Sequence, residues 1–91
     1  MSSASNRYEV ELSEVAKKDL AKLEIKIQER IRLAFKVLSF HPRPPLAKKL
    51  KGRDGYRIRV GDYRIIYEVI DSQVLVLVIR IGHRKEIYKS R

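Results

Sequence analysis

The spacing of apolar residues changes partway along the chain, and this change limits the folds open to it. Before residue 41 the apolar side chains recur at steps of three and four, the period of a helix buried on one side. They are Ala16, Leu20, Leu23, Ile27, Ile31, Ala34 and Leu38. After the prolines at 42, 44 and 45 they alternate in steps of two, as strands do, and residues 7–12 alternate as well. The pattern predicts an α+β chain of order β-α-α-β-β-β.

The helical stretch is too long to be one helix in a small domain. Residues 14–40 would span about 40 Å as a single helix, whereas a compact chain of this size is about 30 Å across. We therefore expect a break around Leu23-Glu24-Ile25 and two antiparallel helices. Ser13 is the expected N-cap of the first helix, and His41 is expected at the C-terminus of the second, before Pro42.

Three strands are expected after the prolines, at residues 56–60, 63–70 and 73–81, with turns at Gly61-Asp62 and Asp71-Ser72. Residues 73–81 are nearly all Leu or β-branched, which is typical of a central strand buried on both faces. Residues 46–52 are expected to be irregular. The two helices should cover one face of a mostly antiparallel four-stranded sheet and leave the other face partly bare.

Length and composition limit the class of protein. With 91 residues we expect one domain over residues 7–91, after a disordered tail over residues 1–6. The chain has no Cys and two His, so no disulfide or cysteine metal site is expected, and no cofactor is indicated. No window of about 18 apolar residues predicts a membrane span, and no secretory signal is recognisable. We expect a cytoplasmic protein.

The charge is strongly positive and unevenly distributed. Lys and Arg number 21 against 11 Asp and Glu, giving a net charge of +10. Residues 1–47 carry nine basic and six acidic side chains, and residues 48–91 carry twelve and five. The excess predicts a polyanionic partner (RNA, DNA or an acidic protein) that contacts the second half of the chain.

Arginines are concentrated on one face of the expected hairpin. With a two-residue turn at Gly61-Asp62, Arg59 lies directly opposite Arg64, and Arg57 shares their face. Like charges directly opposite each other destabilise a strand pair. This arrangement favours a site for phosphate, whose oxygens match the planar fork of Arg. A solvated basic face is the alternative.

More basic residues follow the last strand. His83, Arg84, Lys85 and Tyr88 come directly after Gly82, and an aromatic ring among cations is typical of nucleotide binding. The register of Arg80 stays open here. A two-residue turn at Asp71-Ser72 places it on the core side with Val76 and Val78, and a three-residue loop reverses this.

Residues 49–52, 55–69 and 78–88 resemble the RelE/ParE toxin superfamily, and in particular the RelE-type messenger-RNA interferases. The resemblance implies a RelE-like fold and a toxin of a type II toxin–antitoxin system that cuts mRNA in the ribosomal A site. The implied reaction is attack of a ribose 2′-OH on the adjacent phosphate. The implied partners are the ribosome, mRNA and an acidic, RelB-like antitoxin.

The resemblance also implies catalytic roles for Arg57, Arg59, Arg64, Arg84 and Tyr88, and side-chain chemistry adds His83 as a catalytic candidate. The candidates for RNA binding are the basic residues Lys48, Lys49, Lys51, Arg53, Arg80, Lys85 and Lys89. Well-known members have Lys where this chain has Arg57 and Arg59. Arg does not release its proton at ordinary pH, so these two can stabilise charge but cannot act as the base. Imidazole side chains exchange protons readily near neutral pH, so His83 is the better candidate for proton transfer.

Two other functions fit the same residues. One is a ParE-like inhibitor of DNA gyrase, which binds but does not cleave. The other is an RNA-binding module without catalytic activity. The arginine cluster with His83 and Tyr88 favours the metal-independent endoribonuclease over the gyrase inhibitor, and toxicity on expression would distinguish it from the RNA-binding module.

Overall fold

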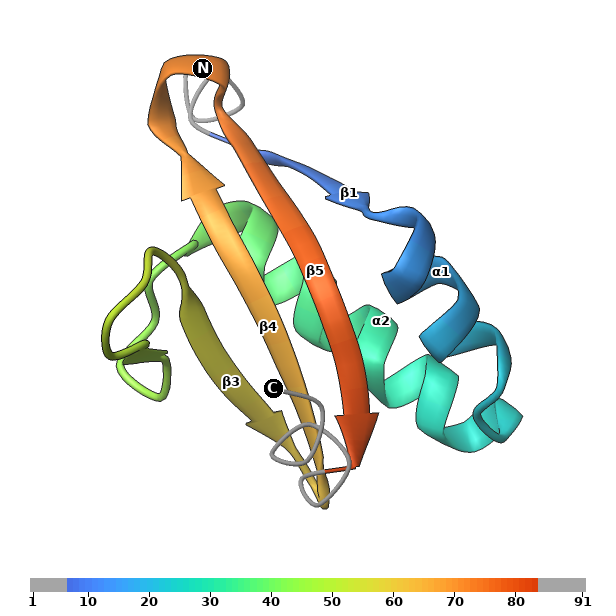
Figure 1. The fold of residues 1–91 in the computed structure, drawn as a ribbon. Coiled ribbons are helices and arrows are strands. Elements are labelled where there is room, and N and C mark those ends of the chain that lie inside the picture. Colours follow the sequence, from blue (N-terminus) through green and yellow to red (C-terminus); the bar gives the residue numbers. More distant parts are fainter. Residues whose placement is uncertain (1–6, 84–91) are drawn as a thin grey trace.

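A computed structural model gives the fold over residues 7–83; the expected tail at residues 1–6 lies outside this range. The described elements are β1 (Glu9–Leu12), α1 (Glu14–Ala21), α2 (Ile25–Phe40), β2 (Lys48–Lys49), β3 (Tyr56–Val60), β4 (Tyr63–Ile70) and β5 (Leu75–His83) (Figure 1). The predicted order of strands and helices is confirmed, with one additional short strand.

The strands form one sheet in the order β1-β5-β4-β3-β2. β1 runs parallel to β5, and the other neighbours are antiparallel. The sheet has five strands rather than the four expected, because Lys48 and Lys49 pair with Arg57 and Tyr56 of β3. Two residues are too few to show an alternating pattern, so the sequence could not reveal β2.

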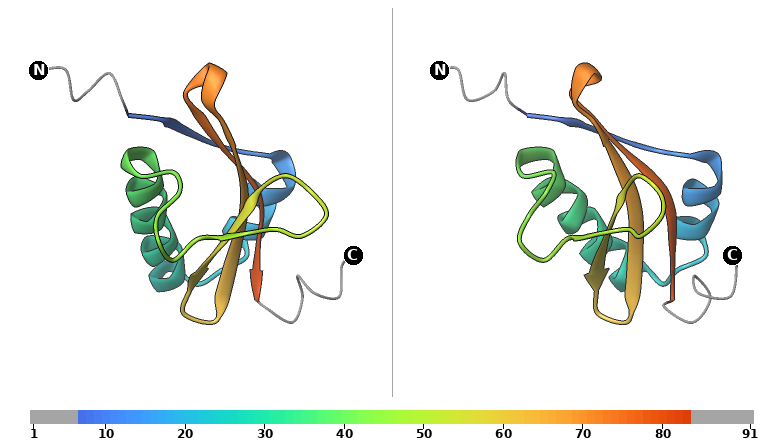
Figure 2. Two further views of the ribbon diagram at one scale, coloured as in Figure 1. Left: turned by 90° about the vertical axis from the view of Figure 1, so that its left-hand side faces the viewer. Right: turned by 60° about the vertical axis from the view of Figure 1, so that its left-hand side comes forward.

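The helices are separated at the predicted corner. α1 ends at Ala21 and α2 begins at Ile25, and the Gln28 side-chain amide donates to the Leu23 carbonyl across the corner, at 2.9 Å. Ser13 is the N-cap: its Oγ accepts from the Ala16 N–H at 3.0 Å. Figure 2 turns the sheet nearly edge-on and shows α2 lying along it. Neither described helix is long and apolar enough to cross a membrane.

One hydrophobic core joins both helices to one face of the sheet. Its buried members are Ala16, Leu20, Ile31, Leu38, Ile58, Ile65, Tyr67, Val76, Val78 and Ile81. Leu23, Ile27 and Ala34 pack against them, so the whole predicted helical stripe faces the core. The opposite face of the sheet is not covered by either helix, and it carries the arginines.

The expectation of a last strand buried on both faces is wrong. In β5, Val76 and Val78 are buried, while Leu75 and Leu77 are half-buried. The central strand is β4, where four consecutive residues from Arg64 to Tyr67 are buried. On the face that the helices leave uncovered, Leu75 and Leu77 lie between the four-residue β1 and the end of β4, whereas the buried Arg64 and Ile66 lie between β3 and β5.

The connection between β4 and β5 also differs from both predicted turns. Ile70 pairs with Leu75, so the loop has four residues, a 3₁₀ turn at Asp71–Gln73 followed by Val74 in the left-handed region (φ 51°). Farther along, Ile66 pairs with Arg80 while Tyr67 pairs with Val78, which leaves Ile79 as an extra residue in a β-bulge. The bulge reverses the alternation, so that Ile81 enters the core and Arg80 points to the opposite face.

Candidate functional site

The uncovered face of the sheet carries the predicted pair of arginines. Arg59 lies directly opposite Arg64, as the two-residue turn at Gly61-Asp62 required, and Gly82 lies on the other side of Arg64. Arg64 is only 7 % exposed, whereas Arg59 is exposed. Gly82 has no side chain to occupy the space beside the Arg64 guanidinium. The pair therefore combines a buried cation with an accessible one.

A second row of residues runs parallel to the first. Lys48, Arg57, Ile66 and Arg80 are paired in turn across β2, β3, β4 and β5. Neighbouring strands lie about 4.8 Å apart, so these cations are spread over roughly 15 Å of the sheet. We call the five cations Lys48, Arg57, Arg59, Arg64 and Arg80 the arginine face. Their grouping is the feature best suited to bind a polyanion.

Arg80 is held at the edge of this face by an acidic residue of α1. Its Nε donates to Asp19 Oδ2 at 2.9 Å, and the same oxygen accepts the backbone N–H of Ile81, also at 2.9 Å. The Asp19 side chain is 12 % exposed and that of Arg80 is 36 % exposed. The ion pair is therefore mostly shielded from water on the Asp19 side and fixes the direction of Arg80.

Where β1 ends, the N-cap of α1 forms hydrogen bonds to the edge of β5 that a neighbouring strand would otherwise form. The last paired residue of β1 is Leu12, opposite Val78. Beyond it the Ser13 N–H donates to the Val78 carbonyl at 2.8 Å, and Ser13 Oγ donates to the Ile79 carbonyl at 2.9 Å. Together with Asp19, these contacts provide hydrogen-bond partners for the backbone groups at the edge of β5 around the bulge.

Sequence reasoning missed Asp19, although its position offered a signal. It lies three residues after Ala16 and four before Leu23, on the helical stripe that faces the core. An acidic side chain on such a stripe needs a donor inside the fold, because burial without one is costly.

His83 differs from its predicted place beside the arginines. It pairs with Tyr63, and the two rings meet edge to face with centroids 5.7 Å apart. By alternation His83 leaves the sheet on the face opposite Arg59 and Arg64. It lines a cavity of about 540 Å³ with Asp19 and Arg80 at the edge of β5. His83 and Arg80 therefore meet around the strand edge rather than on one face.

The remaining predicted residues lie either outside the arginine face or outside the described part of the chain. Lys49 pairs with Tyr56 and so points away from the arginine face, and Lys51 and Arg53 are exposed in the turn before β3. Arg84, Lys85, Tyr88 and Lys89 lie outside the described residues. Within residues 7–83 no three His, Cys, Asp or Glu side chains are grouped as metal ligands.

A polar cluster around Arg43 joins the loop after α2 to the sheet. Arg43 Nη2 donates to Asp71 Oδ2 at 2.8 Å, and its Nε donates to the Tyr56 hydroxyl at 3.0 Å. The Tyr8 hydroxyl donates to Asp71 Oδ1 at 2.7 Å. Hydrogen bonds from Arg43 and then Tyr8 lower the pKa of Asp71 below its ordinary value. This cluster ties β1, β3 and both flanking loops together, away from the Arg59–Arg64 pair.

Comparison with known proteins identifies the family. The profile of the family described as "ParE toxin of type II toxin-antitoxin system, parDE" matches residues 10–88. The chain belongs to the RelE/ParE superfamily of type II toxins. The mRNA interferase toxin RelE of Escherichia coli K12 is 35% identical to it over 88 residues, which cover 91% of this chain and 92% of the relative. Toxin RelG of Mycobacterium tuberculosis is 34% identical over 86 residues, covering 90% of the chain and 97% of the relative.

Solved structures agree with this assignment. The intact E. coli RelBE toxin–antitoxin complex contains a chain with a TM-score of 0.75 and 33% identity, covering 84% of this toxin and 95% of that chain. The RelB–RelE complex of Methanococcus jannaschii gives a TM-score of 0.71 at 33% identity, covering 88% and 96%. The predicted RelE-like fold is therefore confirmed.

Proposed function

We propose that this toxin is an endoribonuclease that cleaves mRNA in the ribosomal A site and thereby stops translation and growth. The observation that carries the proposal is the direct opposition of Arg59 and Arg64 on the uncovered face of the sheet. Such a pair is unfavourable in the isolated protein and becomes favourable when a phosphate lies between the two guanidinium groups. The relative named mRNA interferase toxin RelE supports the same reaction.

The arginine face suits the charge that develops during cleavage. Attack of the ribose 2′-OH on the adjacent phosphate forms a crowded phosphorane with added negative charge, which prepared cations stabilise. Arg57, Arg59 and Arg64 would supply this stabilisation, and the burial of Arg64 strengthens its field because water screens it less. Lys48 and Arg80 would hold neighbouring phosphates, with Lys49, Lys51, Arg53, Lys85 and Lys89 contributing to RNA binding around the site.

Proton transfer requires residues other than the arginines. We propose His83 and Tyr88 as the groups that exchange protons with the 2′-OH and the 5′-oxygen, and Arg84 as a further stabiliser of charge. No metal ion and no cofactor takes part in the proposed reaction. A side chain at the strand edge, such as His83, would reach RNA that passes over the end of β5.

The proposed partners follow from charge and from the structural relatives. Those relatives include RelB–RelE complexes, so we propose an acidic, RelB-like antitoxin for this toxin. Its other partners would be the ribosome and mRNA, and we propose that it acts in the cytoplasm. A net charge of +10 suits an acidic inhibitor as well as RNA.

Cleavage on purified ribosomes tests the proposal. Toxin is mixed with ribosomes carrying an mRNA with an empty A site, and cut sites are mapped by primer extension. Arg59→Ala, an exposed position, should slow single-turnover cleavage by about 100-fold, while Lys26→Ala, an exposed cation on α2, should leave it unchanged. In cells, Arg64→Ala combined with Arg84→Ala should relieve growth arrest. Equal cleavage by the Arg59→Ala and wild-type proteins would contradict the site.

A ParE-like action on DNA gyrase is the second candidate, because the matching family profile is that of ParE toxins. Expression of a gyrase inhibitor leaves mRNA intact and induces the DNA-damage response. Expression of the proposed nuclease cuts mRNA first. Northern blots and a DNA-damage reporter, followed in one culture, separate the two functions.

A further inference from the structure

Lys48 is the single primary amine of the arginine face. The other four members of this face are arginines, which keep their protons at ordinary pH and do not act as nucleophiles. A lysine amine can instead attack a carbonyl carbon. Lys48 lies in β2, the last strand in the order of the sheet, and its side chain is exposed. The face that best suits phosphate therefore also contains one accessible nucleophile.

Two arginines lie close to the Lys48 amine. Lys48 pairs with Arg57, and Arg59 lies two residues along β3 on the same face. Paired residues of antiparallel strands have Cα atoms about 5 Å apart, and residues two apart on one strand are about 7 Å apart. Lysine and arginine side chains are long enough to bridge these separations. The three charged groups can therefore meet around one small dianion.

The three side chains differ in their exposure to water. Arg57 is half-buried, and on β4 it pairs with Ile66, an apolar residue that is 7 % exposed. Water therefore screens a phosphate beside Arg57 less than it would at a fully exposed arginine. Lys48 and Arg59 are exposed, so a small solute can reach both of them.

We propose that Lys48 is a site of acylation by acyl phosphates, small compounds in which a carbonyl carbon is bonded to an oxygen of a phosphate group. Arg57 and Arg59 would bind the phosphate and thereby hold the adjacent carbonyl carbon beside Lys48 Nζ. The neutral amine attacks this carbon and forms an amide. The bond from the carbon to the phosphate oxygen breaks, inorganic phosphate leaves with the electron pair, and the amine proton passes to water.

Acylation would change how the toxin binds RNA. The amide carries no positive charge, so an acylated Lys48 cannot pair with a phosphate of RNA. This consequence rests on the proposed function, in which Lys48 holds such a phosphate, whereas the acylation itself requires only the binding of a small phosphate compound. The supply of acyl phosphate would then set how strongly the toxin binds its substrate.

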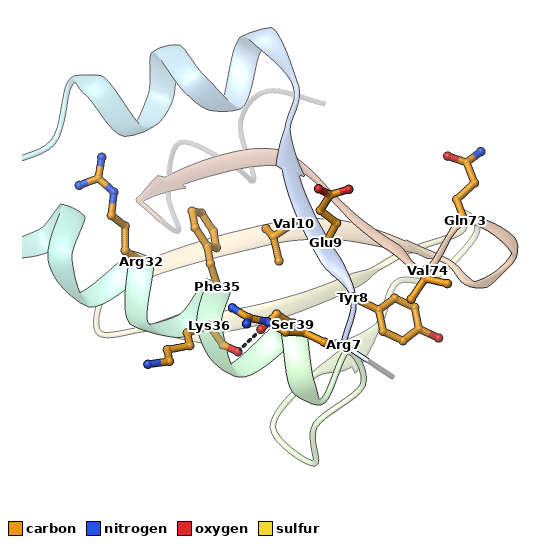
Figure 3. A pocket seen from close by; sticks show the side chains of 10 residues that line it. All are labelled: Arg7, Tyr8, Glu9, Val10, Arg32, Phe35, Lys36, Ser39, Gln73 and Val74. Carbon is orange, nitrogen blue, oxygen red and sulfur yellow. Dashed lines mark hydrogen bonds between the residues drawn. The ribbon is translucent and has the colours of Figure 1, made fainter. Parts of the chain in front are cut away.

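Two other exposed lysines show what the position of Lys48 adds. Lys49 is next in sequence, but it pairs with Tyr56 and points to the opposite face of the sheet. Lys36 lines a groove between β1 and α2 together with Arg32, and Figure 3 shows these two side chains pointing apart. All three amines belong to the same strongly basic protein, so net charge alone would make them react equally.

Peptide mass spectrometry of the folded toxin after exposure to acetyl phosphate tests the site. We expect Lys48 to be acetylated about tenfold faster than Lys49 or Lys36, and inorganic phosphate to suppress the reaction at Lys48 selectively. Acetic anhydride is the matched reagent, because it carries no phosphate, and it should modify Lys48 and Lys49 at similar rates. Arg59→Gln, at an exposed position, should slow acetylation of Lys48 by acetyl phosphate but not by acetic anhydride.

Two substitutions of Lys48 test the consequence for RNA. Lys48→Gln resembles the acetylated side chain and should weaken binding of a short single-stranded RNA about fivefold, with a salt dependence lower by about one released ion. Lys48→Arg keeps the charge and should bind like the wild type. Unchanged RNA binding by Lys48→Gln would refute the control of RNA binding.

The acylation site and the proposed function can fail separately. Acetylation of Lys48 by acetyl phosphate no faster than that of Lys49, or the same preference for Lys48 with acetic anhydride, would overturn the site. Selective acetylation of Lys48 in a toxin that cuts no mRNA on ribosomes would refute the proposed function and support the site.

Discussion

Removing the Asp19 carboxylate should destabilise the toxin more than its place on a surface helix suggests. Asp19 Oδ2 accepts hydrogen bonds from the Ile81 N–H and from Arg80 Nε. In Asp19→Ala the Ile81 N–H loses its partner at the edge of β5, which costs about 1–3 kcal/mol. The loss of the ion pair adds less, because Arg80 is 36 % exposed and can turn to water. We expect a total of about 2–3 kcal/mol.

Two further variants separate the parts of this effect. Asp19→Asn keeps an oxygen that can accept the Ile81 N–H and loses only the charge, so we expect about half the loss. Glu14→Gln on the same helix breaks the exposed pair with Lys17 and should cost less than about 0.5 kcal/mol. Combining Asp19→Ala with Arg80→Ala gives the coupling energy between the two side chains.

Urea unfolding measures the free energies, and NMR hydrogen exchange reports directly on the Ile81 amide. A loss of 2–3 kcal/mol corresponds to a fall of roughly 10 °C or more in the melting temperature of a domain of this size. We expect the Ile81 amide to exchange much faster in Asp19→Ala than in Asp19→Asn. If Asp19→Ala matched Glu14→Gln in stability, or left Ile81 protected, the role assigned to Asp19 would be refuted.

Two predictions concern pH. Hydrogen bonds from Arg43 and Tyr8 hold the pKa of Asp71 below its ordinary value. The Asp71 carboxylate therefore stabilises the folded state at pH values above the unfolded-state pKa of about 3.9. This stabilisation is lost as the pH falls through the lower pKa of the folded state. The stability gap between wild type and Asp71→Asn, measured with urea, should therefore narrow from pH 7 to about pH 2; a constant gap would contradict this. Burial raises the pKa of Tyr67 to about 12, so stability should fall as the pH rises above about 10, where the unfolded chain ionises first. Tyr67→Phe should remove the most alkaline step of the ultraviolet titration and, by losing the bond to the Pro42 carbonyl, cost about 1 kcal/mol at pH 7.

The spacing of the apolar residues and the residues expected in turns were enough to predict most of the fold. The stripe from Ala16 to Leu38 faces the core, and the length argument correctly divided it into two helices. The two-residue turn at Gly61-Asp62 correctly placed Arg59 opposite Arg64. Both predictions succeed because they depend on contacts that are close in sequence or fixed by a short turn.

The errors come from features that depend on distant contacts. Ile79 forms a bulge because Ser13 and Asp19 satisfy the edge of β5 there, and no local pattern around residue 79 indicates this. The bulge decides on which face Arg80 and His83 lie, so the sequence could not assemble the whole site. The Arg43–Asp71 pair could not be predicted from the sequence either, because its two residues are 28 positions apart.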